Sequence, residues 1–461
     1  MADRTPQSAI LAASKRSGDG RNPQLTKLVP ALLDWFSANA RDLPWRRTRD
    51  PYAIWVSEIM LQQTQVKTVI PYWTRWMQEL PTIEAVAKAS PAKIHKLWEG
   101  LGYYSRVRNL QKAARQIVAD CRRRGDESLT KTKSETPSAF AQLRRDKHVV
   151  SYKFPDNYDD VLALPGIGRY TAGAICSIAF NQPVPILDGN VIRVLTRVFG
   201  IGENPREKKT NAQLWQLAAE LVAFTGGARL RRAQISIAGD PATGKGSNGS
   251  TESRPTKNTN CSSLNQSIME LGALICTPRN PQCLVCPVKK LCVAYRENRV
   301  AALPNLGQRT ATTARRFTAF VIERNGKFLV RQRPAGVVNA HLWEFPNTEF
   351  NGANAKDAFK SIFGFRPPAL KPFYTVKHSI TRYRITLEAW RVSFGGASSA
   401  RPHDKMGCRG PSSAAPIFSG RRMEIPPSGK WLTPAQMSRL AFTAAHKKLA
   451  SAATDCILFG P

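Results

Sequence analysis

The spacing of hydrophobic residues differs between the two parts of the chain. From Leu25 to about Ile201, apolar residues recur at helical spacing, and Pro and Gly separate the segments, which is typical of a domain with many helices. Residues 293–316 show no clear periodicity, which predicts a linker. Short segments such as Phe317–Ile322 and Ile380–Trp390 then alternate apolar with polar residues. This alternation predicts strands, and therefore an α+β domain after the helical one.

A tight turn is predicted near the start of the second part. The segments Phe317–Ile322 and Phe328–Arg331 are separated by a stretch that contains Asn325-Gly326. Asn and Gly accept positive φ angles more easily than other residues do, and a two-residue hairpin turn requires such angles. We therefore predict a β-hairpin around Asn325-Gly326.

Low-complexity segments rich in Gly, Ser, Thr, Pro, Lys and Arg interrupt the periodic sequence. Their composition cannot bury enough apolar surface to form a core, and we predict that they are disordered surface insertions. These insertions are expected at about 122–153, 228–262 and 395–428. The remaining boundaries are a disordered arm at 1–24, a helical domain at 25–292, a linker at 293–316 and an α+β domain at 317–461.

The charge balance points to a polyanionic partner. The 461 residues include 68 Lys and Arg but 33 Asp and Glu, so the formal net charge is +35. Nucleic acid is the first expectation, and a merely basic surface is the alternative. No apolar run approaches a membrane span and the N-terminus lacks a signal pattern, although a transit peptide is an alternative for residues 1–24. We expect an intracellular protein, at the nucleoid of a prokaryote or in the nucleus or an organelle of a eukaryote.

Four cysteines lie close together near the end of the helical part. Cys276, Cys283, Cys286 and Cys292 form the pattern C-x6-C-x2-C-x5-C, with prolines that keep the loop irregular. Clustered cysteines in an intracellular chain indicate a metal centre. A [4Fe–4S] cluster fits this spacing, whereas zinc sites usually pair two short Cys-x-x-Cys units. With all four ligands used, either centre would be structural. The other cysteines are expected to be free thiols: Cys121, Cys176, Cys261, Cys408 and Cys456.

Two carboxylates are candidates for chemistry. Glu58 is the single charged residue in the run Trp55–Leu61, and an apolar surround would raise its pKa, as a general acid requires. Asp188 follows the glycine turn that contains Gly166 and Gly168 by about twenty residues, at the start of a predicted helix. Alternatively, Glu58 is an exposed residue of a helix and Asp188 only caps one. The two glycines could let backbone N–H groups bind a phosphate at a helix N-terminus, or they could form a plain helix–turn–helix.

The motifs together resemble one family. The cysteine spacing is similar to the cluster loop of endonuclease III and MutY glycosylases, and L-P-G-I-G with I-L-D-G-N-V resembles the helix-hairpin-helix glycosylase superfamily. W-V-S-E-I-M-L-Q-Q-T, E-G-L-G-Y-Y-S-R and L-W-E-F-P resemble MutY-type adenine DNA glycosylases. The resemblance implies an all-α helix-hairpin-helix glycosylase domain with a [4Fe–4S] cluster loop, followed by an α+β Nudix-like domain.

The same resemblance implies a reaction and its residues. A flipped adenine would be protonated by Glu58 while Asp188 stabilises, or briefly bonds, the oxocarbenium-like sugar, with Tyr170 and Asn190 assisting. Relatives that cut the backbone carry a lysine where this chain has Tyr170, so a monofunctional enzyme is implied. The residues implied to bind DNA or the adenine are Trp45, Arg46, Gln63, Thr64, Leu101, Tyr103, Gly166, Gly168 and Gln266. Of these, Trp45 could equally be core packing, and Gln63 and Tyr103 match wedge residues.

The C-terminal domain is implied to bind rather than to hydrolyse. It lacks the glutamate box of Nudix hydrolases, and its implied role is to recognise 8-oxoguanine opposite the adenine. The family's F-S-H loop is aligned here with His378–Tyr383, where Thr381 would replace the serine and Arg382 the histidine. Selectivity for the oxidised base is therefore less firmly implied than catalysis.

The implied protein is a monomer that acts on double-stranded DNA containing A:8-oxoguanine or A:G mispairs. The rival functions are an endonuclease III-like glycosylase and lyase for oxidised pyrimidines, a noncatalytic DNA-binding protein that contains a cluster, and a pyrophosphohydrolase. Tyr170, Glu58 and the C-terminal domain speak against the endonuclease III-like rival, and the missing glutamate box speaks against the pyrophosphohydrolase.

Overall fold

A computed structural model gives the structure of the chain in two compact units. It describes residues 23–125, 127–129, 150–225, 260–308, 311–349, 354–367, 369–380, 382–393, 417–418, 421–422 and 425–458. The first unit spans Met1–Ala87 and Asn109–Gln308, and the second combines Lys88–Arg108 with Arg309–Pro461. Most of each predicted insertion lies outside the described residues, as does nearly all of the arm at 1–24. No described helix is long and apolar enough to cross a membrane.

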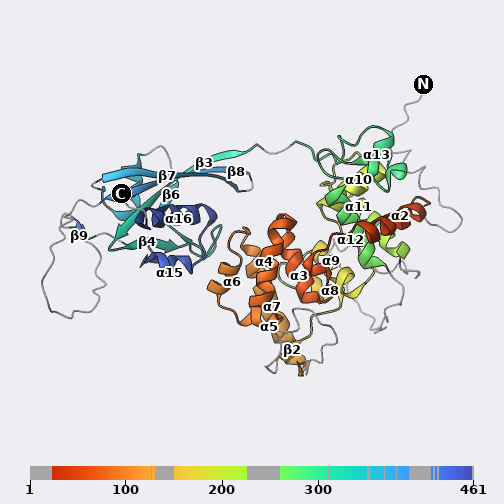
Figure 1. Ribbon diagram of the computed structural model, residues 1–461, viewed down its shortest axis with the longest axis horizontal. Coiled ribbons are helices and arrows are strands. Elements are labelled where there is room, and N and C mark those ends of the chain that lie inside the picture. Colours follow the sequence, from red (N-terminus) through yellow and green to blue (C-terminus); the bar gives the residue numbers. More distant parts are fainter. Residues whose placement is uncertain are drawn as a thin grey trace, which may run out of the picture. The chain divides into compact units, whose positions relative to one another are not determined.

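The first unit is built almost entirely from helices (Figure 1). Its α-helices are α2 (Leu25–Asn39), α3 (Pro51–Leu61), α4 (Val66–Glu79), α5 (Ile83–Lys88, whose last residue falls in the second unit), α7 (Ser105–Arg124, whose first turn falls in the second unit), α8 (Tyr158–Leu162), α9 (Arg169–Phe180), α10 (Gly189–Phe199), α11 (Lys208–Thr225), α12 (Cys261–Leu274) and α13 (Val293–Arg296). Its 3-10 helices are η1 (Pro44–Arg46), η3 (Cys283–Val285) and η4 (Lys289–Leu291), and its strands are β1 (Glu127–Leu129) and β2 (Val150–Tyr152).

Local signals explain where several of these helices begin or end. Asp50 caps α3 by accepting from the backbone N–H of Tyr52, and Pro51 occupies the first helical turn, where a missing N–H costs nothing. Asn181 and Gly200 end α9 and α10 in the left-handed conformation. The apolar faces of α2, α10, α11 and α12 then meet in one buried core. This core supports the start of α10, where Asp188 lies.

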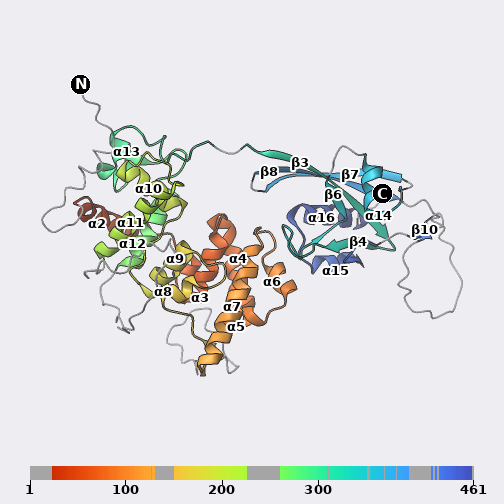
Figure 2. The same cartoon turned by 180° about the vertical axis from the view of Figure 1, so that it is seen from behind.

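The second unit contains a seven-stranded mixed sheet (Figures 1 and 2). Along the main path the strand order is β11-β4-β3-β8-β7, with β5 beside β4 and β6 beside β3; β3 and β8 are parallel and the other pairs antiparallel. The strands are β3 (Thr313–Arg324), β4 (Lys327–Gln332), β5 (Trp343–Glu344), β6 (Asn347–Glu349), β7 (Ala369–Ile380), β8 (Tyr383–Ser393) and β11 (Gly429–Leu432). The short strands β9 (Ile417–Phe418) and β10 (Arg421–Arg422) pair separately. The helices are α6 (Pro91–Leu97), α14 (Ala355–Phe363), α15 (Pro434–Ser438) and α16 (Ala444–Leu458).

Helices cover both faces of this sheet. Side chains alternate along β3, so that Ala319 and Val321 pack with α15 and α16, while Phe320 and Ile322 pack with α14. The period of two along a strand produces this division, and both faces are apolar because both are covered. An α+β sandwich of this kind agrees with the α+β domain predicted from the sequence.

The predicted turn at Asn325-Gly326 is confirmed. Both residues have positive φ, at 50° and 68°, and Arg324 pairs with Lys327 across the turn. The two positive angles match a hairpin turn whose twist suits the flanking strands.

Three segments differ from the sequence-based prediction. Residues 293–316 are not a plain linker, because α13 begins at Val293 and β3 begins at Thr313, where it pairs with Tyr383. Ile380–Trp390 is not one strand: β7 ends at Ile380, β8 begins at Tyr383, and these two residues pair with each other. In the range predicted as the first insertion, β1 and β2 pair with each other. Pairing between strands decides where β1, β2, β3, β7 and β8 begin and end, and local periodicity does not contain that information.

Candidate active site and cluster loop

Glu58 lies on α3 with 5% of its surface exposed. Its Oε2 accepts a hydrogen bond of 2.7 Å from the hydroxyl of Tyr170, which comes from α9. Burial raises the pKa of Glu58 to about 7; the Tyr170 hydrogen bond and the charge of Arg46 lower it, and the neighbouring Asp188 raises it. The carboxyl group can therefore hold a proton near neutral pH, as the apolar surround predicted.

Asp188 is the N-cap of α10. Its Oδ1 accepts from the backbone N–H of Val191 at 2.7 Å, and its Oδ2 accepts from Nδ2 of Asn190 at 2.9 Å. Burial raises the pKa of Asp188, while these hydrogen bonds and the charge of Arg193 oppose the rise. Two hydrogen bonds that favour the ionised form distinguish this carboxylate from Glu58, which accepts one from Tyr170. The capping role and a chemical role are thus compatible in Asp188.

The glycine turn lies between α8 and α9. Gly166 has φ of 79°, and a Cβ built there would lie 2.6 Å from Cβ of Asn109, so both backbone conformation and space require glycine. Gly168 caps α9, and nothing lies within 4 Å of the position of its Cβ. The turn therefore presents an open helix N-terminus, and Tyr170 in the first turn of α9 reaches Glu58.

Trp45 and Arg46 lie in η1. Trp45 is buried and packs edge-on against Trp73 with ring centroids 6.0 Å apart. Arg46 donates to both carboxylate oxygens of Glu270 at 3.0–3.1 Å, and Arg41 donates to them at 2.6–2.7 Å. Burial would raise the pKa of Glu270, but these two guanidinium groups lower it to about 2.

Gln266 lies one helical turn before Glu270 on α12, so the two side chains share a helix face. Its Nε2 donates to Oγ of Ser262 at 3.1 Å. Arg46 of η1 thus contacts Glu270 of α12 directly, and Gln266 lies on α12 one turn before Glu270.

The proposed wedge residues have a common backbone feature. Gln63, in the first unit, and Tyr103, in the second, are both exposed and both have positive φ, at 56° and 44°. L-residues rarely adopt such angles, and strained residues are common at functional sites. Thr64 follows Gln63 and bonds the carbonyl of Gln62, and Leu101 is buried before Tyr103. Thr381 lies outside the described residues.

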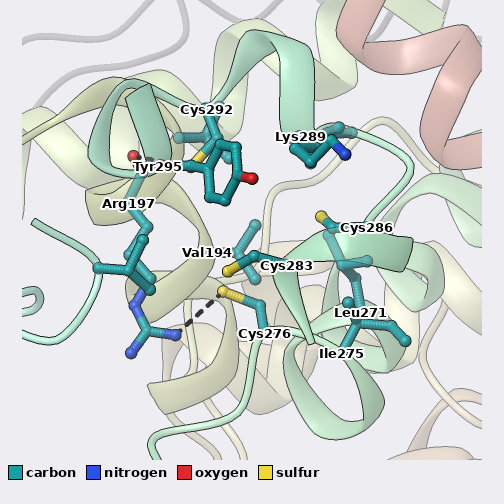
Figure 3. Close-up of a pocket in the computed structure, with 13 residues that line it drawn as sticks. Val194, Arg197, Leu271, Ile275, Cys276, Cys283, Cys286, Lys289, Cys292 and Tyr295 are labelled. Carbon is teal, nitrogen blue, oxygen red and sulfur yellow. Dashed lines mark hydrogen bonds between the residues drawn. The ribbon is translucent and has the colours of Figure 1, made fainter. Parts of the chain in front are cut away.

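The four cysteines of the loop surround one pocket (Figure 3). Cys276, Cys283, Cys286 and Cys292 are unpaired and partly buried, and they line the pocket together with apolar residues of α10 and α12. Four thiols around one shared space are the ligand set that a [4Fe–4S] cluster requires, and their spacing in the loop favours this cluster over zinc.

Two buried arginines of α10 hold the cysteine loop. Arg197 donates to Sγ of Cys276 at 3.3 Å (Figure 3), to the carbonyl of Thr277 at 2.8 Å and to that of Leu303 at 2.9 Å. Arg193 donates to the carbonyl of Cys276 at 2.6 Å and to Oδ1 of Asn190 at 2.7 Å. Since Asn190 in turn donates to Asp188, one guanidinium connects the start of the loop with the candidate catalytic carboxylate.

The motifs quoted from the sequence did not include Arg193, Arg197 or Glu270. A signal was present, because Arg193 and Arg197 lie four residues apart in the otherwise apolar run Val191–Phe199, on one face of the helix. Charged side chains on a buried helix face require partners, and here the partners are backbone carbonyls, a thiol and an amide. Glu270 is likewise the single charged residue of α12, and it is buried.

Comparison with known families agrees with this geometry. Residues 56–220 match the model of the HhH-GPD superfamily of base excision DNA repair proteins, residues 276–292 match the iron–sulfur binding domain of endonuclease III, and residues 318–452 match the NUDIX domain. The fold and the site thus define a base excision DNA repair protein that has an iron–sulfur cluster loop and a Nudix-like domain. The predicted fold class and cluster are confirmed.

Individual relatives identify the family more narrowly. The chain is 31% identical to the adenine DNA glycosylase of Homo sapiens, over 97% of this chain and 78% of that protein. It is 32% identical to that of Mus musculus, over 91% and 76%, and 33% identical to that of Buchnera aphidicola from Schizaphis graminum, over 68% and 73%. The chain belongs to the adenine DNA glycosylase family, and the enzyme class predicted from the motifs is confirmed.

Proposed function

We propose that this protein is a monofunctional glycosylase that removes adenine paired with 8-oxoguanine or guanine in double-stranded DNA. The observation that carries the proposal is the buried Glu58, whose pKa is raised to about 7, together with the neighbouring Asp188, which caps α10. Two carboxyl groups whose environments differ in this way can act as a proton donor and as an anion at the same pH. The substrate also accounts for the excess of basic residues.

In the proposed reaction Glu58 protonates a ring nitrogen of a flipped adenine, which makes the base a better leaving group. Tyr170 holds the Glu58 carboxyl by its hydrogen bond, and Asp188 stabilises the positive charge that develops on the sugar as the glycosidic bond breaks. The bonding electrons leave with the protonated adenine, and water then adds to the anomeric carbon and loses a proton, which gives the abasic sugar. Asn190 and the backbone of Val191 orient Asp188 for that task. Tyr170 occupies the place of a Schiff-base lysine, so the reaction stops at the abasic site.

The surrounding residues would bind the DNA. Trp45, Arg46 and Gln266 are proposed to line the adenine pocket, and the ion pair of Arg46 with Glu270 orients its guanidinium. Gly166 and Gly168 leave the N-terminus of α9 open to a phosphate. Extruding a base costs a few kcal/mol of stacking, and Gln63 and Tyr103, with Thr64 and Leu101 beside them, are proposed to compensate by filling the vacancy.

The cysteine loop and the Nudix-like domain complete the proposal. Cys276, Cys283, Cys286 and Cys292 would hold the [4Fe–4S] cluster, which acts as a structural clamp because no open iron position remains. Helix α14 carries one acidic residue, Asp357, which is paired with Arg366. A hydrolytic Nudix site needs several glutamates, so this domain is proposed to bind 8-oxoguanine, with Thr381 as a contact. The protein would act as a monomer wherever the cell keeps its DNA.

The decisive experiment uses labelled duplexes that hold one A:8-oxoguanine pair, with and without hot alkali. We expect wild-type protein to produce an alkali-dependent nick at the adenine. Glu58→Gln should lower the rate on the order of 10²–10⁴-fold, since it removes the proton donor. The matched control is Glu79→Gln, which neutralises an exposed acid on α4 and should leave the rate unchanged.

Other outcomes have clear meanings. Nicking without alkali would indicate lyase chemistry and contradict the monofunctional assignment. No adenine release by wild-type protein that binds the duplex and carries its iron would favour a noncatalytic binding role.

A further inference from the structure

The segment Lys88–Arg108 belongs to the same compact unit as the Nudix-like domain, although the sequence places it among the helices of the glycosylase domain. It contains α6 and the turn Gly100–Tyr104, which carries Tyr103. We call this turn the wedge turn. Contacts with distant residues near the C-terminus hold the segment Lys88–Arg108 in this unit.

The wedge turn has a strained backbone. Gly100, Gly102 and Tyr103 all have positive φ, at 111°, 69° and 44°, and only the glycines accept such angles without cost. Arg106 contacts the turn in two ways. Its guanidinium donates to the carbonyl of Leu101 at 2.9 Å, and its Cζ lies 5.6 Å from the centroid of the Tyr103 ring. Such a conformation persists only where surrounding contacts impose it.

Glu99, the residue before the wedge turn, makes those contacts with the C-terminal domain. Its side chain is 5% exposed, and both carboxylate oxygens are used. Oε1 accepts from the backbone N–H of Phe442 at 2.9 Å, and Oε2 accepts from Nζ of Lys447 at 2.7 Å and of Lys96 at 2.9 Å. Lys96 also donates to the carbonyl of Leu440 at 3.0 Å. We call this group of contacts the Glu99 latch.

The C-terminal partners of Glu99 are themselves part of the sheet domain. Phe442 forms a parallel bridge with Trp343, whose backbone also bonds Ala441 and Thr443. Lys447 lies on α16, where the preceding His446 accepts from the backbone N–H of Phe345. The latch therefore ends on α16 and on the segment 440–442, which is bridged to Trp343 of the L-W-E-F-P segment.

The charges at the latch favour a fixed geometry. Burial would raise the pKa of Glu99, but the hydrogen bonds from Lys447, from the backbone of Phe442 and from Lys96 hold that pKa below its ordinary value. Glu99 is therefore ionised near neutral pH, and a buried carboxylate with three donors is costly to leave without them. A second contact lies nearby, since Arg108 reaches the carbonyl of Ala340 at 3.4 Å.

We propose that Glu99 is a positioning residue that fastens the wedge turn to the Nudix-like domain and thereby couples insertion of Tyr103 to recognition of the opposite base. The inference rests on the proposed function, because that function assigns the wedge to Tyr103 and the base recognition to this domain. Rigid fastening lets contacts with 8-oxoguanine at one end of the unit stabilise the inserted ring at the other. An enzyme without the latch would still cleave, with less preference for the oxidised partner.

The test measures adenine excision on A:8-oxoguanine and A:G duplexes at subsaturating protein. Glu99→Gln keeps an oxygen for the Phe442 N–H but loses the charge that holds both lysines, and Lys447→Met removes one donor. We expect each variant to reduce the preference for A:8-oxoguanine on the order of tenfold, and the double variant to lose no more than the stronger single one. Lys356→Met, the control at an exposed lysine of α14 in the same unit, should leave the preference unchanged.

Hydrogen exchange of the full-length free protein gives a readout that needs no DNA. The amides of residues 100–104 should exchange faster in Glu99→Gln and Lys447→Met than in wild type, and Lys356→Met should leave them unchanged. Unchanged exchange, additive effects of the two latch variants, or an equal loss on both duplexes would overturn the proposal. Failure of wild-type protein to release adenine would instead contradict the proposed function, and exchange would still decide whether the latch holds the turn.

Discussion

The hydroxyl of Tyr170 donates a 2.7 Å hydrogen bond to Oε2 of Glu58, and these two residues lie 112 positions apart in the chain. Burial raises the pKa of Tyr170 well above its ordinary value, so the phenol keeps its proton and can donate it in a hydrogen bond to the ionised Glu58 carboxylate. The same hydrogen bond lowers the pKa of Glu58, which burial raises to about 7. The pair therefore sets the pH range over which Glu58 can act as an acid.

Replacing Tyr170 by Phe should move the pH dependence of catalysis. Loss of the hydrogen bond removes an interaction that favours ionised Glu58, so the pKa of Glu58 rises further. Because the protonated form is the active one, single-turnover excision by wild type should decline as the pH passes about 7, and the decline in Tyr170→Phe should begin at higher pH. A decline at unchanged or lower pH would show that Tyr170 does not tune this carboxyl.

Glu58→Gln should change stability in a pH-dependent manner. The pKa of Glu58 is about 7 in the folded protein and about 4.5 in the unfolded chain, so the folded state binds the proton more tightly. The stability that this provides is present below pH 4.5 and is lost as the pH rises through about 7. Relative to Glu58→Gln, wild type should lose about 3 kcal/mol of unfolding free energy over that window. Denaturant titrations at several pH values measure it, and a constant difference would contradict burial of an acid.

Asp188→Asn should separate the structural and chemical roles of this residue. Asparagine caps helices about as well as aspartate, so α10 should keep its start and unfolding free energy should change by less than about 1 kcal/mol. Loss of the negative charge beside the sugar should lower the excision rate on the order of 10²–10³-fold. Thermal unfolding and single-turnover kinetics test both parts, and a small rate effect would reduce Asp188 to a helix cap.

Arg193→Met should affect the cluster loop and catalysis together. This guanidinium bonds the carbonyl of Cys276 and the side chain of Asn190, and its removal leaves buried acceptors without donors. The expected destabilisation is on the order of 4 kcal/mol, with less bound iron and a lower excision rate. Iron and sulfide analysis of purified protein is the measurement. Cys121→Ser, which alters a buried thiol far from the loop in sequence, should retain its iron.

Much of the architecture could be read from the sequence because it depends on short-range patterns. Helical spacing in the first part and the Asn325-Gly326 turn are local, and so is the cysteine pattern C-x6-C-x2-C-x5-C, whose ligands lie within 17 residues of each other. Glu58 could be suspected from its apolar neighbours, since residues in contact along one helix determine its burial. Its role, and those of Asp188 and Tyr170, rest on resemblance to a family.

The tertiary structure decided the contacts between distant segments. Nothing in the local sequence of Glu99 indicates that its carboxylate meets Lys447, and nothing near Glu270 indicates Arg41 and Arg46. The pairing of β3 with β8 likewise extends a strand into the stretch predicted as a linker. A buried charge is tolerated only where donors converge on it from elsewhere in the chain. That convergence depends on how elements pack, and periodicity along one element carries no record of it.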